Sequence, residues 1–221
     1  MAFTRLRSLA SLLAALLAFP FPASAFDTPL SDTAVREAYF LGQRGDETMS
    51  HFLGKYTMYL APPKSGPHVA AITMFTPYAL AILESREHSV GYSAQQAALD
   101  HANHAETVKA VLDMLFTDTY GAYIPRPAGS RPDATPGLMP RPYDFWKDFQ
   151  VNFFFKDDQL KPISSLGQPK LACGDGGCTL IGATLEFEFL AENVPSDSIT
   201  IQVTPPEGEE VVFEFDLATL R

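Results

Sequence analysis

Basic side chains are scarce in this sequence. Its 221 residues include 16 Lys and Arg against 26 Asp and Glu, for a formal net charge of −10. A protein that binds DNA or RNA electrostatically needs clustered Lys and Arg to displace the counterions of the phosphates. The acidic balance therefore argues against a nucleic-acid partner.

Disorder and collagen-like repetition are also excluded. Apolar residues make up 46% of the chain and aromatic residues 12%, which is too rich for a disordered protein. The 18 Pro and 14 Gly follow no three-residue period. What remains is a globular chain, and at this length one domain with appendages is the default.

The common catalytic and cofactor motifs are missing. The sequence contains no HExxH, no G-x-x-x-x-G-K and no G-x-G-x-x-G, which argues against phosphate-loop and Rossmann chemistry. The segment Gly91-Tyr92-Ser93-Ala94-Gln95 is half of a nucleophile elbow, but Gln95 stands where the second glycine belongs. Ser93 is better explained as a helix cap. We assign no catalytic residue and expect no cofactor.

An export signal is indicated near the start of the chain. Two arginines precede the apolar run Leu9–Phe19, and Ala23-Ser24-Ala25 follows it. This layout predicts a signal peptide over residues 1–25, cleaved between Ala25 and Phe26. The run is too short to cross about 30 Å of hydrocarbon as a helix. We therefore expect an exported protein, periplasmic or secreted, without a transmembrane segment after cleavage.

Two helices are predicted next. Ser31 or Asp32 can cap a helix that runs to about Gln43, because a short side-chain oxygen accepts hydrogen bonds from otherwise unpaired backbone N–H groups. Asp46 can cap a second helix, with apolar residues at helical spacing up to Tyr56 and a stop at the prolines of positions 62 and 63. Residues 26–67 are thus expected to form an N-terminal helical segment.

The expected β-rich domain spans residues 68–221. It begins with a buried strand over 69–75, followed by a short helix that Thr76 and Pro77 open. Ser93, with Gln96 three residues later, opens another helix to about residue 103. Residues 106–117 alternate as a strand does but also permit a helix, and both interpretations remain open.

A proline-rich stretch interrupts this domain. Residues 121–142 contain six prolines and three arginines without any periodicity. Long irregular segments in compact domains are usually functional or disordered. We expect a mobile surface loop here.

The last third of the chain alternates clearly between apolar and polar residues. Four half-buried strands are predicted, over 149–155, 185–189, 199–203 and 211–216. Their lengths and spacing predict an α+β fold built on an antiparallel β-sandwich, immunoglobulin-like in general architecture. Residues 151–221 carry 12 acidic and only 4 basic side chains, so most of the net negative charge belongs to this sheet region.

Several segments resemble a known family. The segments are Thr76-Pro77-Tyr78-Ala79, Gly91-Tyr92-Ser93-Ala94-Gln95-Gln96, Asp144-Phe145-Trp146-Lys147-Asp148-Phe149 and Phe215-Asp216-Leu217-Ala218-Thr219-Leu220-Arg221. They resemble landmarks of a family of uncharacterised secreted bacterial proteins, over nearly all of the chain that follows the signal peptide. The resemblance implies that the protein is located in the bacterial envelope and consists of a single domain. It implies no reaction, ligand or functional residue.

The only two cysteines predict a disulfide. Cys173 and Cys178 flank a glycine-rich turn, so in an exported protein they can face each other on paired strands. The spacing is not CxxC, which argues against redox catalysis. The expected role of the bond is to hold the register of a hairpin.

One cluster has metal-ligand character. Asp100, His101, His104 and Glu106 lie close in sequence, and the two histidines share one helix face if the helix extends that far. A third ligand would have to come from elsewhere, and a polar helix end collects the same residue types. We therefore assign no metal and keep the four residues as candidates.

Aromatic residues are dense between positions 145 and 155. Six of them, including Trp146, fall within eleven residues. They are typical of core packing at the start of a strand, and a protein- or sugar-binding platform is the alternative.

Two functions are compatible with these observations. The first is a non-enzymatic binding or accessory module in the bacterial envelope or outside the cell, with an envelope or extracellular protein or polymer as partner. The second is a secreted hydrolase whose site is assembled from distant residues around His101 and His104.

Overall fold

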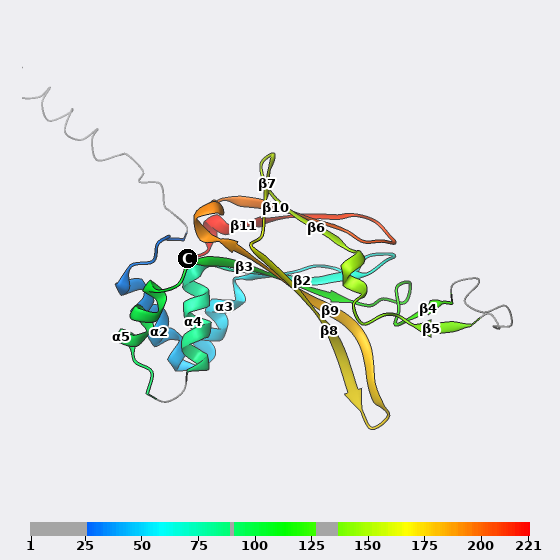
Figure 1. The fold of residues 1–221 in the computed structure, drawn as a ribbon, viewed down its shortest axis with the longest axis horizontal. Coiled ribbons are helices and arrows are strands. Elements are labelled where there is room, and N and C mark those ends of the chain that lie inside the picture. The colour runs from blue at the N-terminus through cyan, green and yellow to red at the C-terminus, as the bar shows by residue number, and fades with distance from the viewer. Residues whose placement is uncertain (1–25, 89–90, 127–136) are drawn as a thin grey trace, which may run out of the picture.

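Over the residues that the structure describes, the fold consists of four helices and two larger antiparallel sheets (Figure 1). The structure is a computed structural model, and it describes residues 26–88, 91–126 and 137–221. The predicted signal peptide and the centre of the proline-rich stretch lie outside the described residues. Among those that are described, no helix has the length and apolar character needed to cross a membrane.

The first two helices begin at the predicted caps. Helix α2 (Asp32–Arg44) follows Ser31, whose hydroxyl accepts a hydrogen bond from the Ala34 N–H, and it ends at Gly45 with a φ of 58°. Helix α3 (Glu47–Gly54) follows Asp46. Each cap satisfies a backbone donor that has no partner inside its helix.

Helix α3 is shorter than predicted. Beyond Gly54 the chain turns into strand β1 (Thr57–Tyr59), so the expected continuation to the prolines at 62 and 63 is wrong. The Tyr56 carbonyl accepts from the Met74 N–H at 2.9 Å, and β1 then pairs with the next strand. Pairing to a neighbouring strand outweighs the local helical pattern at this point.

The other two helices pack on α2. Helix α4 (Pro77–Glu87) starts after Thr76 and helix α5 (Ala94–Ala102) after Ser93, both as predicted. They share an apolar cluster with α2 and α3, in which Ala38 and Ile82 are fully buried. The helical layer therefore combines segments from both sides of residue 67.

The larger sheet has five antiparallel strands. Its order is β1, β2 (His68–Phe75), β3 (Thr107–Leu115), β9 (Gly177–Leu190) and β8 (Ser164–Gly174). Every second residue of β3 is buried, which resolves the strand-or-helix question in favour of the strand. Strand β8 was not among the predicted strands, because most of its residues are exposed and do not alternate in polarity.

The smaller sheet contains three of the four strands predicted in the last third. Its order is β11 (Val211–Asp216), β10 (Ser198–Thr204), β6 (Gln150–Phe155) and β7 (Asp158–Leu160). The fourth prediction, over 185–189, falls within β9. The two sheets face each other and enclose one apolar core (Figure 1). Side chains buried from both sheets include Ile72, Leu112, Phe153, Phe189, Ile201 and Phe215.

The proline-rich stretch contains secondary structure at its described ends. Its described ends form two short strands, β4 (Tyr123–Pro125) and β5 (Leu138–Pro140), which pair with each other in antiparallel fashion. The guanidinium of Arg141 lies 3.7 Å from the centre of the Tyr120 ring, and its Nε donates to the Gly121 carbonyl at 2.9 Å. These contacts join the base of the stretch to the core side of the sandwich.

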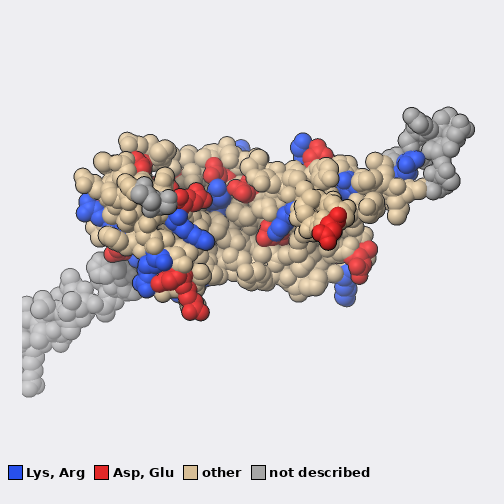
Figure 2. All heavy atoms as spheres, turned by 90° about the horizontal axis from the view of Figure 1, so that it is seen from below, with Lys and Arg blue, Asp and Glu red and all other residues tan. Residues whose placement is uncertain are grey.

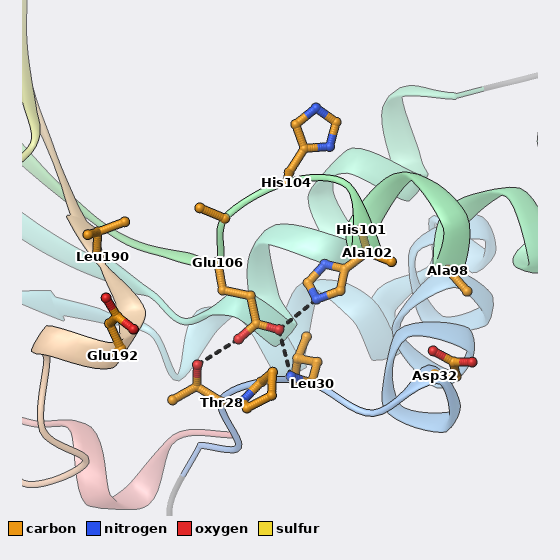
Figure 3. A pocket seen from close by; sticks show the side chains of 12 residues that line it. Thr28, Leu30, Asp32, Ala98, His101, Ala102, His104, Glu106, Leu190 and Glu192 are labelled. Atoms are coloured by element: carbon orange, nitrogen blue, oxygen red, sulfur yellow. Dashed lines mark hydrogen bonds and ion pairs between the residues drawn. The ribbon is translucent and has the colours of Figure 1, made fainter.

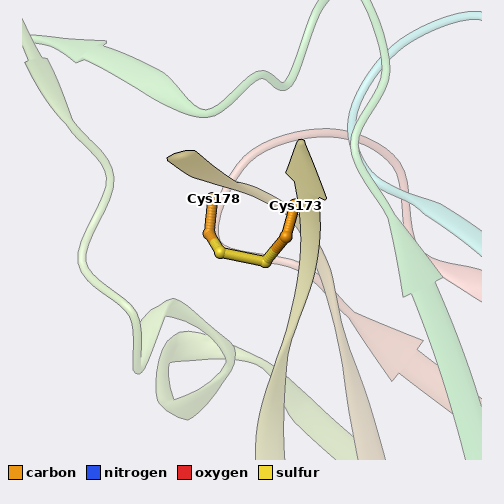
Figure 4. Close-up of a disulfide and its surroundings, with 2 residues drawn as sticks. All are labelled: Cys173 and Cys178. Carbon is orange, nitrogen blue, oxygen red and sulfur yellow. A yellow bond between two sulfur atoms is a disulfide. The ribbon is translucent and has the colours of Figure 1, made fainter. Parts of the chain in front are cut away.

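The predicted disulfide is present. Cys173 and Cys178 are directly paired residues of β8 and β9, with Cα atoms 4.0 Å apart (Figure 4). All residues from 171 to 179 are exposed, so the bond closes the tip of the hairpin rather than a buried core.

The contact between α2 and α4 gives a first prediction. A Cβ atom at Gly42 would overlap the carbonyl oxygen of Ile82 and lie 3.0 Å from the Ser85 Cβ, whereas one at Gly54 would meet nothing within 4 Å. We expect Gly42→Ala to lower the free energy of unfolding by about 1–3 kcal/mol, because the helices must move apart. Gly54→Ala should leave it unchanged or raise it by up to about 1 kcal/mol. Urea unfolding measures both, and equal effects would contradict the close approach.

The disulfide gives a second prediction. Thiol titration of the unfolded, unreduced protein should find no free thiol, and two after reduction. Replacing both Cys173 and Cys178 with Ser should lower the free energy of unfolding by at most about 2 kcal/mol, because the closed loop is short. Two reactive thiols before reduction would show that the bond does not form.

Candidate functional site

The predicted histidine cluster is organised around Glu106 (Figure 3). This residue lies between α5 and β3, and its carboxylate accepts from the Thr28 hydroxyl at 2.6 Å and from the Leu30 N–H at 2.6 Å. His101 Nε2 lies 2.7 Å from the carboxylate oxygen Oε1. The Glu106 side chain is only 11% exposed and that of His101 18%. A carboxylate offers only acceptors, so His101 carries its proton on Nε2 here.

The four candidate metal ligands do not converge. His104 points away from the Glu106 carboxylate, and its Nδ1 lies 2.8 Å from the Asp100 carbonyl oxygen (Figure 3). The Asp100 carboxylate accepts from the Gln96 side chain at 2.7 Å. In the part of the chain that the structure describes, no group of three His, Cys, Asp or Glu side chains is arranged to hold a metal ion.

The same geometry gives little support to nucleophilic catalysis. A histidine oriented by a carboxylate is a common general base, but it must reach the nucleophile. The nearby hydroxyl of Thr28 bonds to Oε2 of Glu106, the oxygen on the other side of the carboxylate from His101. Glu106 therefore acts as an anchor, because three donors from two separate parts of the chain meet on one carboxylate.

A cavity of about 540 Å³ adjoins this anchor, and we call it the Glu106 cavity. Leu30, Ala98, His101, Glu106, Leu190 and Glu192 are among its lining residues. The Thr28 hydroxyl, the Leu30 N–H and His101 bond to Glu106 there, so these polar groups are not directed at a ligand.

A second hollow lies between the two sheets at one side of the sandwich, and we call it the Trp146 groove. Its volume is about 600 Å³. Its apolar side chains belong to Trp146, Phe149, Val151, Leu185 and Phe187. Leu166 also borders the groove, but it is opposite Glu186 in the sheet and its side chain lies on the outer face. Among the described residues that line the groove, Lys147 is the only one with an ionisable side chain.

The groove exists because both sheets end on this side. Strand β7 pairs only with residues 153–155 of β6, and β8 is the last strand of the larger sheet. Phe149 and Leu185 are buried at the floor, whereas Leu166 is 54% exposed at the rim. The groove is therefore an opening toward the apolar core that the two sheets share.

Trp146 covers part of β8. It belongs to the 3₁₀ helix η2 (Phe145–Asp148), and its indole ring lies on the backbone at Gly167. A Cβ atom at position 167 would overlap the ring, so the close contact requires glycine there. Of the aromatic segment singled out in the sequence, Phe145, Phe149 and Phe153 are buried in the core, and Trp146 reaches the groove.

Sequence reasoning missed the other wall of the groove. Ser165, Leu166 and Gly167 belong to β8, whose exposed and irregular sequence gave no strand signal. The cysteine pair was the one available indication, since a hairpin closed by Cys173 and Cys178 implies a strand before residue 173.

The charges near the groove are mixed. Figure 2 shows acidic and basic side chains side by side in small groups, separated by wide uncharged areas, on the face seen from below in Figure 1. Lys109 lies 3.4 Å from a Glu186 oxygen and 3.6 Å from a Glu188 oxygen, so one ammonium group serves two carboxylates. Lys147 lies 3.1 Å from the Asp144 carboxylate, which lowers the pKa of Asp144.

No protein-family model and no curated protein matches this sequence.

The anchoring role of Glu106 is testable. Glu106→Gln removes an acceptor that three donors share, and we expect it to lower the free energy of unfolding by about 1–3 kcal/mol. Hydrogen exchange of the Leu30 amide should become faster. Glu192→Gln, at an exposed position on the same cavity, should change neither measurement. An unchanged Leu30 exchange rate in Glu106→Gln would contradict the anchor.

Proposed function

We propose that the protein is an exported, non-enzymatic binding module of the bacterial envelope or extracellular space, and that it holds its ligand in the Trp146 groove. The proposal rests on the volume and lining of this groove. Ligand sites in proteins have volumes of about 300–1,000 Å³, with mostly apolar and aromatic walls and a few polar groups. The groove matches this description in volume and lining.

Three observations support export. The first 25 residues have the layout of a signal peptide. Phe26, the first residue after the predicted cleavage, is 2% exposed, and its backbone N–H donates to the Ser196 hydroxyl at 3.1 Å. The exposed disulfide belongs to the oxidising compartments outside the cytoplasm.

The lining of the groove favours binding over catalysis. Ser165 provides the only side-chain hydroxyl among the described lining residues, and Lys147 is bonded to Asp144 rather than to that hydroxyl. The Glu106 cavity places no nucleophile beside His101. A secreted hydrolase centred on His101 and His104 is therefore the weaker candidate.

We also propose the immunoglobulin-like architecture for the sandwich. Two antiparallel sheets that share one core support it. Proteins with sandwich folds of this kind have many different functions, so the architecture does not identify the ligand.

The proposal is tested with an apolar dye. Trp146 is the only tryptophan, so energy transfer from it to bound prodan, an uncharged naphthalene dye, reports on the groove directly. We expect saturable binding that Ser165→Lys weakens about tenfold, because residue 165 is opposite Phe187 and an ammonium group there would enter the apolar groove. Leu171 is 43% exposed on the same strand but does not line the groove, and Leu171→Lys should leave dye binding unchanged.

Two results would count against the proposal. One is the absence of saturable energy transfer. The other is equal weakening by the two substitutions, since dye bound elsewhere on β8 would not distinguish residue 165 from residue 171.

A further inference from the structure

Strand β8 is an unusually long free edge. It extends over 11 residues and pairs with β9 on one side, and it is the outermost strand of its sheet. An edge strand presents a row of backbone N–H and C=O groups that another strand can pair with. Proteins usually protect such edges with proline, charge or a covering element.

The protecting features of β8 lie in its second half. Pro169 has no N–H to offer, and proline is tolerated in sheets mainly where its nitrogen faces away from the paired strand. Lys170 carries a charge and lies 2.9 Å from an Asp113 oxygen. The disulfide then closes the hairpin. By contrast, the first half, Ser164–Gln168, contains neither proline nor charge.

The unprotected half of the edge coincides with the Trp146 groove. Ser165, Leu166 and Gly167 lie within Ser164–Gln168 and line the groove. In the register of the sheet, Ser165 is opposite Phe187 and Gly167 is opposite Leu185. A strand added to this edge would continue the sheet, and alternate side chains of that strand would enter the groove.

The charges around the edge favour a basic partner. Ser164 donates to the Glu188 carboxylate at 3.3 Å, and Glu188 shares the single ammonium of Lys109 with Glu186. Residues 151–221 carry 12 acidic and 4 basic side chains. A second copy of this acidic chain would be repelled, whereas Lys or Arg on the added strand would be attracted.

We infer that the occupant of the groove is an extended peptide segment of a partner protein, apolar at alternate positions and basic at the others. It pairs with Ser164–Gln168 of β8 and inserts an apolar side chain beside Trp146. This is peptide recognition by strand addition, in which backbone hydrogen bonds give affinity and the groove gives specificity. The inference rests on the proposed binding function and names its ligand class.

The test uses the whole exported chain and a defined peptide. The probe is the acetylated, amidated peptide Lys-Val-Lys-Phe-Lys-Val-Lys, titrated against Trp146 fluorescence. One matched peptide has two adjacent central amides N-methylated, so that one of them must face β8. Another carries Glu in place of every Lys. Hydrogen exchange of the amides of residues 164–168 is measured with and without the parent peptide.

We expect saturable binding of the parent peptide. The N-methylated peptide should bind at least about tenfold more weakly, because it cannot complete the backbone pairing. The acidic peptide should also bind more weakly, and exchange within 164–168 should slow on binding. Ser165→Lys should weaken binding of the parent peptide by about tenfold, because its ammonium group would occupy the groove, and Leu171→Lys should weaken it by less than about twofold.

The contrary outcomes separate the two proposals. If the N-methylated peptide binds as tightly as the parent while the dye still distinguishes Ser165→Lys from Leu171→Lys, strand addition is wrong and the binding groove stands. If neither dye nor peptide binds saturably, both proposals fail. If sedimentation shows a dimer that Ser165→Lys dissociates, a second copy occupies the edge and the peptide inference is overturned.

Discussion

The burial of alternate side chains along β3 is the constraint on which the rest of the structure depends. Val108, Ala110, Leu112 and Met114 are almost completely buried, while the residues between them face the outer side of the sheet. Strand β3 pairs with β2 on one side and with β9 on the other. Through β9 it positions β8 and one wall of the Trp146 groove, and at its start it positions Glu106. A shift of one residue in its register would disturb both sites.

The histidine cluster illustrates how a polar group of residues can serve structure alone. Glu106 is nearly buried, and a buried carboxylate is stable only when its oxygens are satisfied. The chain satisfies them with a hydroxyl and a backbone N–H from one segment and an imidazole from another. These hydrogen bonds join residues 26–30 to α5 and to the start of β3.

The Trp146 groove exists because the two sheets do not close over the core on one side of the sandwich. Both sheets end at the same side of the sandwich, and η2 covers only part of the opening. The core is therefore accessible next to a strand edge whose backbone is free to pair. Apolar lining and available backbone groups occur together there, and this combination suits an extended peptide better than a compact ligand.

The sequence by itself determined the features that depend on neighbours along the chain. Local hydrogen bonds from side chain to backbone set the helix starts at Ser31, Asp46, Thr76 and Ser93. The alternating strands follow from burial of every second residue. The spacing of the two cysteines implied the disulfide of the hairpin. Only the tertiary structure decided the path of β1 and β8, the role of Glu106 and the existence of the groove. Strand β8 is held by pairing with β9 and by Trp146 on Gly167. Such contacts join residues far apart in the chain, and no local pattern encodes them.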